Sequence, residues 1–98
     1  MALGGDGIIS VIANAFPREF SSIAKSCFTG DYNEARKTHY LLVDLIYLLF
    51  AEGNPGGVKA ACHILGLMEN ELRLPLVPVS KELIVKLENQ IDLIQKSA

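Results

Sequence analysis

Residues 31–50 read DYNEARKTHYLLVDLIYLLF, the longest stretch of helical apolar spacing in the chain. Asp31, with Glu34 three residues later, resembles a capping box, in which an acidic side chain accepts a free N–H group of the first helical turn. Apolar residues then recur at helical spacing on one broad stripe, formed by Leu41, Leu42, Leu45, Ile46, Leu48, Leu49 and Phe50. So wide an apolar face needs cover from several neighbouring elements.

A shorter helical pattern precedes this one. Pro17 suits a first helical position, and apolar residues follow it at helical spacing until Gly30, where a glycine can end a helix. We therefore expect a helix from about Pro17 to Thr29.

Two further helices are predicted in the second half. Gly53 should end the long helix, and the Asn54-Pro55 pair should act as cap and first residue of a short helix that stops at Gly66. Residues 74–79, LPLVPV, contain two prolines, so we expect an extended segment that lies across a surface. The last helix should be capped by Ser80 and bury a narrow seam of Ile84, Leu87, Ile91 and Ile94.

Residues 7–12, GIISVI, form the single strand-like run of the sequence. Apolar residues on both faces predict a strand buried on both sides, as in a parallel sheet. A lone strand cannot satisfy its backbone groups without partners, so we expect the run to be mispaired, paired with another chain, or disordered. The expected fold is mainly α with this one strand, and the missing strands should lie upstream.

The composition is that of a small globular domain. Half of the 98 residues are hydrophobic and a fifth are charged, with a net charge of -2, and this length leaves room for one domain. Basic residues do not cluster, which disfavours a nucleic-acid partner. The most apolar run, residues 40–51, is shorter than the roughly 20 residues that cross a bilayer, and the N-terminus lacks signal-peptide features. We expect no membrane partner and a cytoplasmic location.

The two cysteines are expected to be buried thiols. Cys27 and Cys62 lie on the apolar side of their helical patterns, where a reduced cysteine behaves as a small hydrophobe. A zinc site would have to combine them with His39 and His63, but a closely spaced cysteine pair is missing, so we expect no metal. Each histidine is better explained as an ordinary helix residue.

The residues do not form a catalytic constellation. The glycines of residues 4–7 precede the strand, whereas those of a dinucleotide-binding loop follow one. All six lysines fall on polar helix faces or at helix ends, which does not suit the desolvated lysine of a Schiff-base enzyme. The acidic pair Glu69 and Glu71 fits a solvated loop. We predict no catalytic residue and no cofactor, and the residues alone indicate a helical segment of an α/β protein.

Several motifs nevertheless resemble a known family. In order they are GGDGIISV at residues 4–11, AN at 13–14, PR at 17–18, GD at 30–31, NP at 54–55, VK at 58–59, LGL at 65–67 and LRLPL at 72–76. At these spacings they resemble the C-terminal part of the dihydrodipicolinate synthase family, Schiff-base lyases of the N-acetylneuraminate lyase superfamily. The resemblance covers nearly the whole chain.

The resemblance implies a (β/α)8 TIM barrel, of which residues 1–30 would be the last strand and helix and residues 31–98 the C-terminal three-helix extension. The family condenses pyruvate, held as an imine on a lysine, with aspartate semialdehyde in lysine biosynthesis. Its catalytic lysine, tyrosine and arginine belong to preceding segments, so this chain should be inactive by itself. By resemblance, Ile9 would lie at the pyruvate pocket, with Gly7 and Ser10 close to it.

Two alternatives are compatible with these residues. The parent could be another pyruvate-dependent lyase of the superfamily, or the chain could be a small helical interaction module without enzyme activity. Either way, the wide apolar helix should be exposed and favour a homo-oligomer. Residues 52–57, EGNPGG, are glycine-rich where the family often has prolines, so we expect this junction to be flexible.

Overall fold

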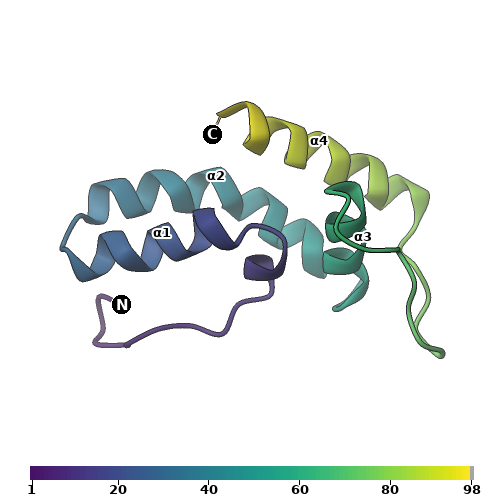
Figure 1. Cartoon of the computed structure of the whole chain (residues 1–98), viewed down its shortest axis with the longest axis horizontal. Coiled ribbons are helices and arrows are strands. Elements are labelled where there is room, and N and C mark those ends of the chain that lie inside the picture. Colours follow the sequence, from purple (N-terminus) through teal and green to yellow (C-terminus); the bar gives the residue numbers. More distant parts are fainter. Residues whose placement is uncertain (98) are drawn as a thin grey trace.

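The computed structural model describes residues 1–97. Within that range a short 3-10 helix, Ile12–Asn14, is followed by four α-helices: α1 Pro17–Phe28, α2 Tyr32–Phe50, α3 Gly56–Ile64 and α4 Lys81–Ser97. Figure 1 shows α2 at the centre, with α1 along one side, α4 along the other and α3 near its C-terminal end. The prediction of a mainly helical chain is confirmed.

Local sequence signals set the bounds of the first two helices. Pro17 is the first residue of α1, and Gly30 follows its end with a φ of 80°, a conformation that glycine adopts without strain. The turn is closed by the Asp31 N–H, which donates to the Ser26 carbonyl at 2.8 Å. The Asp31 carboxylate in turn accepts the Glu34 N–H at 3.1 Å, which confirms the predicted cap of α2.

The stripe on α2 forms the centre of the hydrophobic core. Leu42, Leu45 and Leu49 are 0% exposed because α1, α3 and α4 all pack against this helix. Burial of each such side chain contributes about 1.5–3 kcal/mol. The prediction that this face needs cover from several elements is confirmed. The expectation that it would be exposed is wrong for these three leucines, whereas Phe50 at the end of the stripe is 50% exposed.

The remaining core comes from the flanking elements. α4 contributes a narrow seam as predicted, although Leu83 is buried and the predicted Ile84 only partly so; the seam is Leu83, Leu87, Ile91 and Ile94. Cys62 of α3 and Phe16 before α1 are also buried in the same cluster. One continuous core thus runs through the described chain.

The junction between α2 and α3 differs from the sequence-based expectation. α3 begins at Gly56, one residue later than predicted, and Asn54 makes no capping bond. Gly56 and Gly57 are buried and helical, so this half of the glycine-rich junction is not a flexible linker. A Cβ built on Gly57 would lie 2.2 Å from the Leu49 carbonyl oxygen. Glycine is needed there because the backbones of α2 and α3 approach so closely.

Replacing Gly57 with alanine should therefore destabilise the fold. We expect Gly57→Ala to lower the free energy of unfolding by roughly 1–3 kcal/mol, because the backbone of Leu49 must move, even though alanine is the better helix former. Urea unfolding followed by circular dichroism measures this. Gly7→Ala is the control, since a Cβ there meets nothing within 4 Å. An unchanged midpoint for Gly57→Ala would contradict the close approach.

A loop links α3 to α4 and projects from the helices as an arm, defined here as residues 67–78 (Figure 1). Leu74 and Val77 on the arm are 85% and 66% exposed. The prediction that the proline-rich stretch lies across a surface is not met within this chain. At the end of the arm, Val79 returns to the core, where its Cγ1 lies 3.0 Å from the position of a Cβ on Gly56.

The start of α4 is tied to the end of α2. The Ser80 Oγ accepts the Leu83 N–H at 3.2 Å, which confirms the predicted cap. The Glu52 carboxylate accepts both the Ser80 N–H, at 2.9 Å, and the Ser80 hydroxyl. These two hydrogen bonds hold the pKa of Glu52 below its ordinary value of 4.5, and the bond from the Ser80 hydroxyl has the larger effect.

The Glu52 link predicts a pH dependence of stability. A carboxylate whose pKa is lowered by folding stabilises above its unfolded pKa, and that contribution is lost as the pH falls through the folded pKa. Glu52→Gln should therefore be less stable than the native chain at pH 7, and the difference should be lost as the pH falls below 4.5 through the lowered pKa of Glu52. Urea titrations at several pH values test this, with Glu69→Gln as control; a difference that persists in acid would contradict the assignment.

The predicted strand is absent from the described residues. Residues 1–11 have no regular secondary structure, and the 3-10 helix replaces the end of the expected strand. Ile8 and Ile9 are 68% and 105% exposed rather than buried on both faces. The physical reason is that a strand needs neighbouring strands to pair its backbone groups, and residues 1–97 supply none.

Candidate functional site

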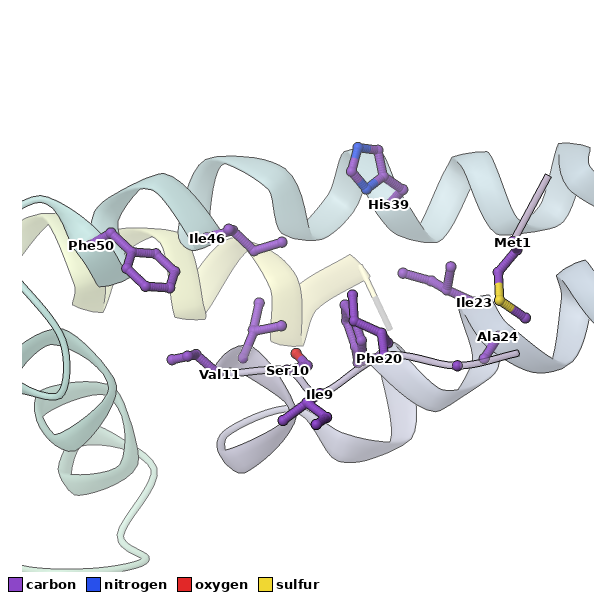
Figure 2. Close-up of a pocket in the computed structure, with 13 residues that line it drawn as sticks. Met1, Ile9, Ser10, Val11, Phe20, Ile23, Ala24, His39, Ile46 and Phe50 are labelled. Carbon is purple, nitrogen blue, oxygen red and sulfur yellow. The ribbon is translucent and has the colours of Figure 1, made fainter. Parts of the chain in front are cut away.

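An open apolar groove separates the N-terminal segment from α1 and α2. We call it the N-terminal groove; its volume is about 500 Å³. Figure 2 shows the residues that line it: Met1, residues 7–12, Phe20, Ile23, Ala24, His39, Ile46 and Phe50. Its size is within the range of small-molecule sites, and it is bounded on one side by a segment that lacks secondary structure.

The N-terminal segment is anchored at one end of the groove. Ile12 is buried, and the Ala13 N–H donates to the Ser10 Oγ at 3.2 Å, which fixes the bend into the 3-10 helix. In Figure 2 the side chains of Val11 and Phe20 point toward α2, whereas Ile9 points away from it. Ile9, the one residue predicted to line a substrate pocket, therefore stands at the rim and in solvent.

Few polar side chains line the groove. Ser10 and His39 are the polar side chains among the lining residues that the structure describes, and neither a carboxylate nor a lysine joins them. Such a surface makes mainly apolar contacts and lacks the lysine amine on which a Schiff-base lyase forms its imine. Gly7, Ile9 and Ser10 all line this groove, and their role at a pyruvate pocket stays a prediction. Nothing in the sequence indicated the walls that α1 and α2 contribute, because the fold has to bring these two helices beside the segment.

The lysines are engaged in surface contacts or are free in solvent. Lys37 lies 3.6 Å from Glu34, and Lys96 lies 2.9 Å from Asp92, whose hydrogen bond raises the pKa of Lys96. Lys59 differs from the prediction: it is half-buried, and its Nζ donates to a carbonyl in the arm, that of Glu71, at 3.1 Å. This bond holds the base of the arm near α3.

The cysteines and histidines do not converge. Within residues 1–97, a group of three His, Cys, Asp or Glu side chains placed to hold a metal does not occur. Cys62 is 1% exposed and is a core thiol as predicted, while Cys27 is only partly buried. Burial raises the pKa of Cys62, and this outweighs the opposing effect of Lys59. The Nδ1 of His63 lies 3.0 Å from the Met68 carbonyl and serves the local turn.

The two thiols should differ in reactivity. We expect iodoacetamide to alkylate Cys27 at least about tenfold faster than Cys62 in the native chain, because Cys62 is shielded and its raised pKa leaves less thiolate. Peptide mass spectrometry over a time course measures both rates. In denaturing urea the two rates should become similar, which controls for intrinsic reactivity. Equal rates in the folded chain would contradict the burial of Cys62.

The match to known proteins is extensive. A profile of the Dihydrodipicolinate synthetase family matches residues 1–94. The chain belongs to this family. A 4-hydroxy-tetrahydrodipicolinate synthase from Parabacteroides distasonis is 53% identical over 78 residues, and the match covers 80% of this chain but 26% of the relative. The synthase from Thermotoga petrophila is 44% identical over 89 residues, covering 91% of this chain and 30% of the relative.

Solved structures of dihydrodipicolinate synthases superpose closely. The enzyme from Thermotoga maritima gives a TM-score of 0.93 at 40% identity, over 96% of this chain and 32% of that one. The Aquifex aeolicus enzyme gives 0.85 at 44% identity, over 98% and 32%. The described helices thus reproduce part of these synthases. The chain spans between a quarter and a third of the length of the relatives it matches.

None of the helices within residues 1–97 combines the length and the apolar character needed to cross a membrane.

Proposed function

We propose that this chain is the C-terminal part of a dihydrodipicolinate synthase, an enzyme that condenses pyruvate with aspartate semialdehyde in lysine biosynthesis. One observation carries the proposal: nearly all of the chain superposes, with a TM-score of 0.93, on about a third of a synthase of this family. The apolar groove supports it, because a segment that lies beside a catalytic centre needs to supply walls and not reacting groups. The parent enzyme is proposed to be cytoplasmic and a homo-oligomer.

The family resemblance suggests how the chain divides into two parts of the parent fold. Residues 1–30 correspond to the last strand and helix of the TIM barrel, and residues 31–98 to the C-terminal helical extension. Barrel active sites lie at the C-terminal ends of the strands, so the end of the strand-like run is the expected place for a pocket residue. Ile9 remains the residue proposed to lie beside pyruvate. Its exposed position at the rim of the groove is compatible with that role.

The isolated chain is proposed to be inactive. A class I aldolase-type reaction needs a lysine that loses its proton because it is desolvated. The lysines with described partners bind carboxylates or a carbonyl, and the N-terminal groove contains none of them. Another pyruvate-dependent lyase of the same superfamily is the second candidate for the parent. The helical interaction module loses its main support, because Leu42, Leu45 and Leu49 at the centre of the α2 face are buried within the chain.

Trapping of a pyruvate imine tests the proposed inactivity. We expect borohydride reduction in the presence of pyruvate to leave the isolated chain unmodified, since none of its lysines lines the N-terminal groove and a stable imine needs a lysine enclosed in a binding site. Intact-mass spectrometry detects the adduct. The Thermotoga maritima synthase, treated in parallel, is the positive control. A stoichiometric adduct on any of the six lysines of this chain would overturn the proposal.

A further inference from the structure

The arm is fastened to the helices near both of its ends. On the α3 side, the Lys59 Nζ donates to the Glu71 carbonyl at 3.1 Å. On the α4 side, the Glu52 carboxylate accepts the Ser80 N–H at 2.9 Å and also accepts the Ser80 hydroxyl. Residues 73–78 between these attachments are all exposed, so the arm has little packing of its own. Its position within the chain therefore depends on how its ends are held.

The attachment on the α4 side depends on one negative charge. Ser80, which donates to Glu52, also holds two N–H groups of the first turn of α4: its Oγ accepts that of Leu83 at 3.2 Å, and its carbonyl accepts that of Ile84 at 3.1 Å. A hydrogen bond to a carboxylate is roughly twice as strong as one between neutral groups. The carboxylate also lies at the N-terminus of α4, where a negative charge is favoured. Protonation of Glu52 removes both contributions.

Few other groups hold the arm on this side. Val79 is buried and is the apolar part of the attachment. Lys86 of α4 lowers the pKa of Glu52, and Lys81 is the first residue of the same helix. Residues 51–57 of the α2–α3 junction carry no charged side chain besides Glu52. The hydrophobic core of the described chain contains no carboxylate, so acid acts on the attachment and not on the core.

We propose that Glu52 and Ser80 form an acid-sensitive latch on the arm. Protonation of Glu52 releases the C-terminal end of the arm together with the first turn of α4, while the helical core stays folded. The chain thus has two states, one with this end of the arm fastened and one with it free, and the charge on a single carboxylate sets the balance between them. This inference does not rest on the proposed function, because all of its groups lie within residues 52–84.

Hydrogen exchange of single amides, measured by NMR at increasing urea concentrations and corrected for the intrinsic rate, tests the latch. The contribution of Glu52 is lost as the pH falls below 4.5 through its lowered pKa. Between about pH 7 and about pH 3, we therefore expect the protection of Leu83 and Ile84 to fall at least about tenfold, through an opening that urea hardly affects. The core amides of Leu45 and Leu49 should still exchange only through urea-dependent global unfolding. Equal protection and urea dependence of all four amides would overturn the latch.

Glu52→Ala distinguishes the latch from other effects of acid. At about pH 7 this variant should already show low protection of Leu83 and Ile84, and acid should lower it little further. Glu88→Ala, which removes an exposed carboxylate of α4, is the control and should keep the native response to acid. An acid-induced loss that persists in Glu52→Ala would overturn the assignment to Glu52. Loss of the helical circular dichroism signal over the same pH range would contradict a core that stays folded.

Proteolysis reports on the arm itself. Trypsin cleaves after Arg73, which is exposed on the arm, and cleavage of a loop becomes faster when an end of the loop is released. At neutral pH we expect Glu52→Ala to be cut there at least about threefold faster than the native chain, and Glu88→Ala to be cut at the native rate. Equal cleavage of all three proteins would overturn the release of the arm, even if the first turn of α4 loosens.

Discussion

The burial of one leucine stripe on α2 is the interaction on which the rest of the structure depends. Leu42, Leu45 and Leu49 are fully buried because α1, α3 and α4 converge on this helix. A chain of 98 residues has few alternatives for burying so broad a stripe, so its other helices are arranged around it. The result, within residues 1–97, is a core built from helices alone.

Two local contacts fix how the later helices meet α2. The missing side chain of Gly57 allows α3 to touch the backbone of Leu49, and the hydrogen bonds between Glu52 and Ser80 tie the start of α4 to the end of α2. The arm between α3 and α4 therefore leaves the core from a fixed base, which Lys59 reinforces. The exposed tip of the arm therefore projects from two ends that hydrogen bonds hold in place.

The candidate site follows from the same arrangement. The N-terminal segment lies beside α1 and α2 with open backbone groups, and it forms one wall of a mainly apolar groove. The chain has the shape of part of a synthase, and the proposed function assigns the chemistry to the part that it does not cover.

The sequence by itself determined the helices and the family, because caps such as Asp31 and Ser80, helix-ending glycines and apolar spacing act within a few residues of one another. It also showed that Ile9 lies in a strand-like segment whose backbone groups require neighbouring strands for hydrogen bonding. Only the tertiary structure decided that the α2 stripe is covered from within and that Gly57 is a contact point, since both depend on residues distant in sequence. It also decided that residues 7–12 form no strand, because pairing requires neighbours that local sequence cannot supply.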